Sequence, residues 1–323
     1  MSWIDLLTIN PLNILYHAIN PALLYFIDRD LLDKKVASIE NLWELPEPKK
    51  IIIKQQENGS WKYPGNTTNN DIGTNYALIE TFRTLRYLVE KYGFNHAHPT
   101  LQKAAEYIFS CQTSEGDIRG ILSNQYMPYY VGAILELLIK AGYDKDERLI
   151  KGLDWLLSMR QNDGAWFIPL QAYKITYIYQ VAFDDPIPPD RTKPFSHLAT
   201  GMILRAFAAH PQYRFLPEIK KAGNLLKSRI LKPDAYNDHK AIKYWTNFQF
   251  PFWWTDLISA LDSLFKLGFD REDPDVAKGL DWFIQNQGEN GLWKACYEKR
   301  PEMDLWVSLA ACRVLKNYFG ELV

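Results

Sequence analysis

The 323-residue sequence has few cysteines and no excess of charge. Its 3 cysteines are too few and too widely spaced for a disulfide framework, so a reducing, cytoplasmic setting is expected. The 37 lysines and arginines nearly balance 38 aspartates and glutamates, which predicts no nucleic-acid partner. No apolar run reaches the roughly 18 residues of a membrane-spanning helix, and the first residues lack the basic region of a signal peptide.

Aromatic residues, in contrast, make up 14% of the chain, and many of them belong to an internal repeat. Residues 142–166 begin with a glycine, contain Lys-Gly-Leu-Asp-Trp at 151–155 and end in Gln-Asn-Asp-Gly-Ala-Trp. Residues 268–293 repeat this order, with Lys-Gly-Leu-Asp-Trp at 278–282 and the ending Gln-Gly-Glu-Asn-Gly-Leu-Trp. A weaker copy covers 93–118, and residues 55–61 supply a fragment that ends in Gly-Ser-Trp.

The spacing inside each copy predicts helices. Apolar residues recur every three or four positions, and Asp146 and Asp273 stand where the first residues of a helix need an N-cap. Second, more apolar helices are expected between the copies, at about 72–91, 128–141, 196–209, 252–267 and 304–318. A degenerate copy at about 213–236 lacks the Gly-x-Trp ending. We therefore predict an all-α fold of five to six antiparallel helix pairs.

The connections between these helices complete the predicted organisation. The whole chain, 1–323, is expected to form a single domain, and the N-terminal segment 1–45 is expected to pack on the helices or to close them into a ring. Residues 165–195 form the one long irregular connection, and loops of that length in compact domains are often functional.

The Gln-x3-Gly-x-Trp ending resembles the QW repeat of squalene/hopene cyclases and the related repeat of protein prenyltransferase β subunits. It is complete at Gln55/Gly59/Trp61 and at Gln287/Gly291/Trp293, and one residue short at Gln161. The resemblance spans about 50–320 and implies an (α/α) toroid whose inner helices surround a central cavity. It implies less about activity, because catalytic and purely binding proteins share this architecture.

The catalytic signatures of both families are absent. The Asp-x-Asp-Asp motif of the cyclases occurs nowhere, and no cysteine follows an aspartate at the spacing of the prenyltransferase zinc site. Val307 stands where the zinc-ligand histidine would be. No cofactor is therefore predicted, and Mg²⁺ is expected only if the substrate is a diphosphate.

If the toroid is correct, the cavity is lined by the starts of the inner helices, where aromatic and polar residues gather. Substrate-binding candidates are Asn75, Tyr129, Tyr130, His197, Trp245, Trp253, Trp254 and Trp306. Such rings shape an apolar site and stabilise a carbocation through their π faces. The alternative for each ring is ordinary packing in a helical core, and for His197 an ordinary hydrogen-bonded histidine.

Asp256 is the favoured acid, because it follows two tryptophans at the start of an apolar helix. A carboxyl group pressed against aromatic rings is a suitable general acid. Asp71 and Asp304 are further catalytic candidates, and for all three the alternative is an aspartate that stabilises a helix N-terminus. Asp184 and Asp185 are weak metal candidates, since three prolines within 184–190 exclude the helical metal motif of terpene synthases. Cys296 is interpreted as a small core residue.

Three functions remain open at this point. The first is a terpene cyclase-like enzyme that acts on an isoprenoid with a non-standard acid, and the second is a non-catalytic toroid that binds an apolar ligand or a protein partner. The third is a carbohydrate-active α/α-toroid enzyme with paired carboxylates. The apolar N-terminal segment around 10–27 either packs on the toroid or makes peripheral membrane contact. The sequence does not indicate the oligomeric state.

Overall fold

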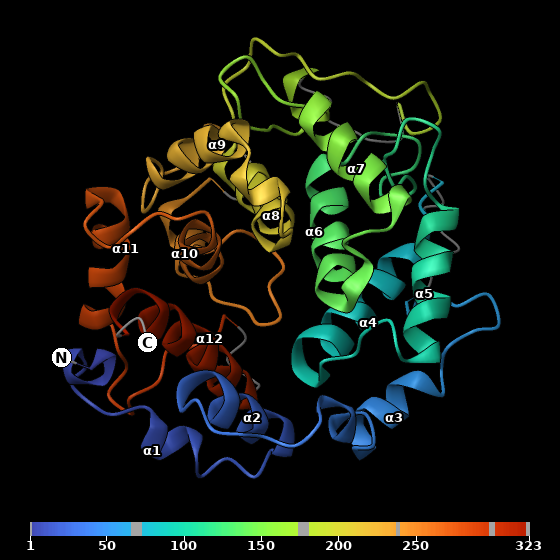
Figure 1. Cartoon of the computed structure of the whole chain (residues 1–323). Helices are drawn as coiled ribbons and strands as arrows, with labels where there is room; N and C mark the ends of the chain where they lie inside the picture. Colours follow the sequence, from blue (N-terminus) through green and yellow to red (C-terminus); the bar gives the residue numbers. More distant parts are fainter. Residues whose placement is uncertain (1, 66–72, 174–180, 237–239, 297–300, 321–323) are drawn as a thin grey trace. The chain divides into compact units, whose positions relative to one another are not determined.

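The computed structural model of the protein describes residues 2–65, 73–173, 181–236, 240–296 and 301–320. Over these residues the regular structure is helical, with isolated bridges and no β-strand, which confirms the predicted all-α class (Figure 1). The chain divides into two compact units, one of residues 39–222 and one of residues 1–38 with 223–323. The single toroid domain over 1–323 stays a prediction.

Short flanking helices alternate with core helices in the 39–222 unit. The flanking helices are α3 (Pro46–Ile52), α5 (Pro99–Ser110) and α7 (Glu147–Ser158), and the core helices are α4 (Tyr76–Tyr92), α6 (Pro128–Leu138) and α8 (His197–Ala209). Helix α9 (Pro217–Lys227) spans the boundary between the units. The predicted N-cap is confirmed here, since Asp146 caps α7. The repeat glycine Gly142 ends the turn after α6 with a φ of 90°.

The core of this unit lies between α6 and α8. Residues His197 to Ala208 of α8 are all buried, and so are ten of the eleven residues of α6. The two helices approach closely at Gly132, where an added Cβ would lie 2.7 Å from the Ile203 Cα. A glycine is therefore needed at this crossing.

Charged side chains from α4, α6 and α8 meet in the same core. Glu136 accepts hydrogen bonds from Arg205 Nε at 2.8 Å and from Lys140 Nζ at 2.7 Å, and Lys140 also donates to Glu90 at 2.5 Å. The side chains of Arg205 and Glu136 are only 3% and 6% exposed. Burial lowers the pKa of Arg86 to about 9, and the nearby negative charge of Glu136 opposes part of this decrease. Glu136 thus accepts hydrogen bonds from two cationic side chains, of which Arg205 is buried.

The other unit combines the two ends of the chain. Its N-terminal part holds η1 (Trp3–Leu6), α1 (Leu12–Leu15), α2 (Pro21–Phe26) and the π-turn η2 (Ile27–Leu31). Its C-terminal part holds η8 (Ile242–Trp245), α10 (Leu257–Lys266), α11 (Pro274–Gln285) and α12 (Pro301–Phe319). Helix α10 packs on both α11 and α12 (Figure 1). Asp273 caps α11, as predicted.

The N-terminal segment packs on α12. Arg313 of α12 pairs with Asp30 at 2.5 Å, and the Phe26 ring lies edge-on to Trp306 with centroids 6.2 Å apart. The segment leaves Ile14, Tyr16 and Ile19 exposed. None of the described helices is both long and apolar enough to cross a membrane. Peripheral membrane contact through the exposed side chains stays a prediction.

One core helix is shorter than predicted. The expected helix over 252–267 begins only at Leu257, because Asp256 has an extended backbone and caps the helix with its side chain. The adjacent tryptophans, Trp253 and Trp254, therefore lie in the connection before α10 instead of in its first turn.

The repeat glutamines link each copy to the next flanking helix. Gln55 Nε2 donates to the carbonyl of Gly59 at 2.9 Å and to that of Thr100, in the first turn of α5, at 2.8 Å. Gln112 makes the same two bonds, to its own repeat glycine and to Arg148 in the first turn of α7, both at 2.8 Å. In these two copies the repeat glutamine therefore binds a backbone carbonyl in the first turn of the next flanking helix.

Two later copies use the same glutamine differently. Gln161 Nε2 donates to the carbonyls of Asp190 at 2.6 Å and Lys193 at 3.1 Å, in the long connection before α8. Gln287 exchanges hydrogen bonds with Ile9, whose carbonyl accepts at 2.7 Å and whose N–H donates at 3.0 Å. In the last copy the N-terminal segment therefore takes the place that a flanking helix takes in the first two.

The repeat tryptophans bind the end of the preceding helix. One of them, Trp245, was not recognised as a repeat residue from the sequence. The indole N–H of each of the others donates to a carbonyl ten residues earlier, from Trp61 to Ile51, from Trp166 to Leu156 and from Trp293 to Phe283. Trp245, which is 0% exposed, donates to Lys232 at 2.9 Å just after α9. It supplies the tryptophan that the degenerate copy lacks at the expected position.

We expect Gly59→Ala to lower the free energy of unfolding by about 2–4 kcal/mol, because an alanine there is both strained and obstructed. The φ of Gly59 is +89°, and an added Cβ would lie 2.1 Å from the backbone oxygen of Lys103. Urea unfolding followed by circular dichroism measures the loss.

Gly291→Ala is the matched control for this substitution. Its φ is +78°, but an added Cβ there would meet Cγ2 of Ile9 at 2.7 Å, a side chain that can move. The control should cost about 1–2 kcal/mol, mostly from the left-handed backbone. Equal losses at both positions would show that the carbonyl contact contributes nothing.

Candidate functional site

The residues predicted from the sequence fall into two groups, one in each unit. Asn75, Tyr129, Tyr130 and His197 belong to the 39–222 unit, and Trp245, Trp253, Trp254, Asp256, Asp304 and Trp306 belong to the unit built from both chain ends. The third acid, Asp71, lies outside the described residues.

In the 39–222 unit the predicted polar residue at the start of α4 is fully engaged. Asn75 caps α4, and its Oδ1 accepts from the Leu78 N–H at 2.9 Å and from the Tyr107 hydroxyl at 3.1 Å. Its Nδ2 donates to Cys111 Sγ at 3.6 Å. Asn75 thus has a clear structural role as a helix cap.

The predicted ligand residues of α6 and α8 are mostly packed inside. The rings of Tyr129 and Tyr130 lie 4.7 Å apart, with Tyr129 buried and Tyr130 half-buried against Phe82. His197 is the first residue of α8 and is 2% exposed. Of these three, Tyr130 keeps the most accessible surface for a ligand.

The described part of the long connection, 165–173 and 181–195, contains no cluster of metal ligands. The side chains of Asp184 and Asp185 are exposed, and the Asp184 carbonyl accepts from Asn124 Nδ2 at 2.9 Å. Within the ranges that the structure describes, no three His, Cys, Asp or Glu side chains come together as a metal site. The surface-loop interpretation of these two aspartates fits their exposure.

In the other unit two of the predicted tryptophans are packed rather than open. Trp245 is fully buried in its repeat position, and Trp306 is 1% exposed. The Trp306 ring stacks on Phe250 with centroids 5.9 Å apart and an interplanar angle of 9°. Both indoles pack in the interior of this unit, and neighbouring side chains cover their surfaces.

Trp253 and Trp254 keep accessible surface, and a buried carboxyl group follows them. Both indoles are half-buried, with centroids 6.1 Å apart, and Asp256 is only 2% exposed. Asp256 Oδ1 accepts from the Ser259 N–H at 2.8 Å, and Ser259 Oγ accepts from the Asp256 N–H at 3.0 Å. Asp256 is therefore the N-cap of α10 in a capping box. This agrees with the alternative given for Asp256 from the sequence, an aspartate that stabilises a helix N-terminus.

The prediction that Cys296 is a core residue is wrong, because the residue is exposed. The Cys296 N–H donates to the Phe248 carbonyl at 2.9 Å, which ties residues 295–296 to the stretch before Trp253. Desolvation and the nearby charge of Asp256 both raise the pKa of this thiol. Cys296 therefore lies near Asp256, and a thiol reagent can label the unit at this position.

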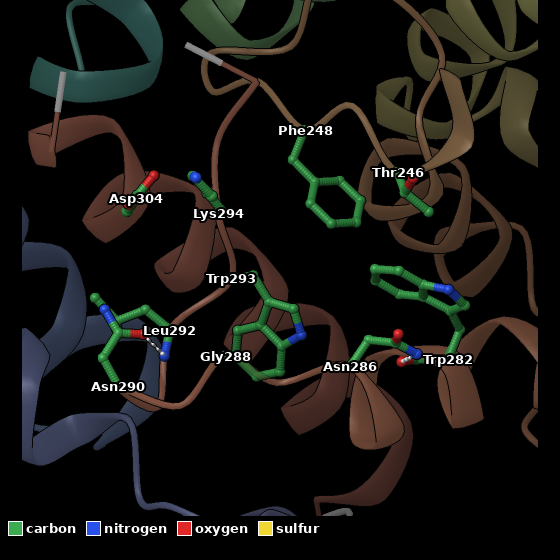
Figure 2. Close-up of a pocket in the computed structure, with 10 residues that line it drawn as sticks. All are labelled: Thr246, Phe248, Trp282, Asn286, Gly288, Asn290, Leu292, Trp293, Lys294 and Asp304. Atoms are coloured by element: carbon green, nitrogen blue, oxygen red, sulfur yellow. Dashed lines mark hydrogen bonds between the residues drawn. The ribbon is translucent and has the colours of Figure 1, made fainter. Parts of the chain in front are cut away.

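Asp304 lies in the first turn of α12 and lines a pocket of about 440 Å³ (Figure 2). Its Oδ1 accepts from the Ala295 N–H at 2.8 Å. The same pocket is lined by Phe248, Trp282 and Trp293, and by the amides of Asn286 and Asn290. The residues that accompany Asp304 were not predicted as site residues. Phe248 carries no repeat signal, and Trp282 was interpreted as part of the repeat.

The sequence matches no family model and no curated protein. Among solved structures, a protein from Actinoplanes is 14% identical, with 86% of this chain and 87% of that chain covered and a TM-score of 0.46. A variant of the type II terpene cyclase MstE from Scytonema, in complex with geranylgeranyl dihydroxybenzoate, is 13% identical over 95% of this chain and 97% of that chain, with a TM-score of 0.47. A second MstE variant without ligand is 14% identical over 91% and 85%, with the same TM-score. These values are too low to establish a fold or an activity.

Proposed function

We propose that the protein binds an isoprenoid at Trp253 and Trp254 and that Asp256 protonates one of its double bonds to start a cyclisation. The observation that carries the proposal is a buried carboxyl group two residues after two half-buried indoles. The repeat tryptophans add support, because Trp61, Trp166 and Trp293 all donate to a carbonyl ten residues earlier, as copies of one repeat should. The α/α toroid with a central cavity belongs to this proposal.

The chemistry follows from these groups. The carboxyl proton adds to one alkene carbon, the π electron pair forms the new C–H bond, and the neighbouring carbon becomes cationic. A second double bond attacks that carbon and closes a ring, and the last cation loses a proton to a base. Indole faces stabilise such cations by roughly 0.5–2 kcal/mol per contact. The product is an isomer of the substrate, and a diphosphate group, if present, is not cleaved.

The test is incubation of the full chain with candidate isoprenoids, after native mass spectrometry of the purified protein for bound lipid. The probes are farnesyl and geranylgeranyl diphosphate, squalene and geranylgeranyl dihydroxybenzoate, each with and without Mg²⁺; the last is the ligand of the MstE complex. We expect a cyclised isomer from at least one probe. Trp254→Leu should lower its yield about tenfold, whereas Trp282→Leu, a half-buried indole outside the proposed site, should not. No binding and no product from any probe would refute the proposal.

Non-catalytic binding of an apolar ligand is the second candidate. It is favoured by the capping box at Asp256, which gives this carboxylate a structural task that requires no chemistry. Its signature in the same experiment is an isoprenoid that binds, depends on Trp254 and is recovered unchanged.

A further inference from the structure

The pocket beside α11 has a preformed wall (Figure 2). The Trp293 N–H donates to Ser308 Oγ at 2.9 Å and its indole donates to the Phe283 carbonyl at 3.1 Å. The Phe248 ring stacks on Phe283 at 5.5 Å and meets Trp282 edge-on at 5.6 Å. Because backbone and rings are both held, little reorganisation is needed before a ligand enters.

The repeat itself shows that an open tryptophan at this position is unusual. Trp155 and Trp282 occupy the same place in the two full copies, as the last residue of Lys-Gly-Leu-Asp-Trp. Trp155 is 5% exposed, and the ring of Tyr126 covers it at 5.7 Å. Trp282 also has a ring beside it, Phe248 at 5.6 Å, but it stays half-buried and lines the pocket. The second copy has therefore opened a surface that the first keeps closed.

Polar groups with spare hydrogen-bonding capacity line the same pocket. Within the described residues, the Trp282 indole N–H, Oδ2 of Asp304 and Oδ1 of Asn286 have no hydrogen-bond partner, although the rest of each group is anchored. Asn290 uses its Oδ1 to accept from the Leu292 N–H at 3.2 Å and keeps its amide N–H groups. The charges of Lys294 and Asp304 have opposite signs, so the lining has no net charge.

We propose that this pocket binds a neutral sugar. A sugar ring has an apolar C–H face that packs on an indole, and hydroxyl groups that pair with amide and carboxylate oxygens. An isoprenoid would leave the remaining polar atoms of Asp304 and the two asparagines without hydrogen-bond partners. A strongly charged ligand would meet a wall without net charge. The volume of about 440 Å³ lies within the range of small-molecule sites.

Titration of the full chain with sugars tests this proposal. The probes are glucose, galactose, mannose, N-acetylglucosamine and the disaccharides cellobiose and maltose, followed by saturation-transfer NMR and tryptophan fluorescence, with farnesol as the apolar comparison. We expect at least one sugar to bind with a millimolar dissociation constant. Trp282→Leu should weaken that binding about tenfold or more.

A second variant protects the test against misfolding. In Asp304→Asn the side-chain oxygen can still accept from the Ala295 N–H, but the free carboxylate oxygen is replaced by an amide, so sugar binding should fall while the melting temperature stays unchanged. Phe215 is an exposed aromatic residue of the 39–222 unit, so Phe215→Leu is the control and should bind sugar like wild type. The proposal is overturned if no sugar binds, if both pocket variants bind like wild type, or if only farnesol binds in a Trp282-dependent way. None of these outcomes depends on isoprenoid turnover.

Discussion

Replacing Asp256 by asparagine is expected to lower isoprenoid cyclisation by about 10²–10⁴-fold while leaving the fold intact. Asparagine caps helices as well as aspartate does, so the bond from the Ser259 N–H and the start of α10 are retained. Asparagine has no acidic proton to give to an alkene. Product formation measured by gas chromatography, together with the melting temperature of each variant, separates the two roles.

Asp273→Asn is the matched control for this prediction. Asp273 caps α11 as Asp256 caps α10, and it stands at a flanking helix without an adjacent tryptophan pair. Its substitution should leave product formation unchanged. Full activity in Asp256→Asn would assign this carboxylate to capping alone and would leave the proton donor elsewhere in the chain.

Glu136→Gln should lower the free energy of unfolding by about 3–5 kcal/mol. The substitution removes the negative charge that faces the buried Arg205 guanidinium at 2.8 Å and Lys140 at 2.7 Å. Arg205 is only 3% exposed, so water cannot replace the lost carboxylate without opening the contact between α6 and α8. Urea unfolding of the variant and of wild type gives the difference.

Glu106→Gln tests whether burial causes this effect. Glu106 makes a bidentate pair with Arg148 at 2.7 and 2.9 Å, but the two side chains are 64% and 41% exposed. Its loss should cost less than about 1 kcal/mol. The double variant Glu136→Leu/Arg205→Leu should recover part of the stability, since it removes both charges together. A small effect of Glu136→Gln would contradict the importance assigned to this cluster.

The helix ends could be predicted from the sequence, because a cap or a terminating glycine acts on the residues next to it. Asp146 and Asp273 cap the helices that follow them, and Gly142 ends a helix in the left-handed conformation. These outcomes need only a few adjacent residues to be known. The start of α10 was predicted five residues early because hydrophobicity continues through Trp253 and Trp254, whereas the N-cap of the helix is Asp256, whose own backbone is extended.

The buried charges and the pocket were harder to predict, because their contacts join residues that are distant in the sequence. Glu136 and Arg205 are 69 positions apart, and nothing near either one marks it as buried. Trp245 stands 13 residues after its hydrogen-bond partner instead of the usual ten, which hid its repeat role. Phe248 and Trp282 form one wall only after residues 248 and 295 pair. Tryptophan content predicts an aromatic site, but not which rings remain accessible.

The attachment of Ile9 and Asp30 has a consequence for the order in which the newly made chain folds. Their partners Gln287 and Lys316 lie 278 and 286 positions later, so they leave the ribosome long after Ile9 and Asp30. The 39–222 unit is continuous, so its contacts can form during translation, whereas the first segment waits for α12. Leu23 and Ile27, which are fully buried in the finished protein and belong to elements that pack on α12, therefore stay uncovered by α12 until that helix has been made.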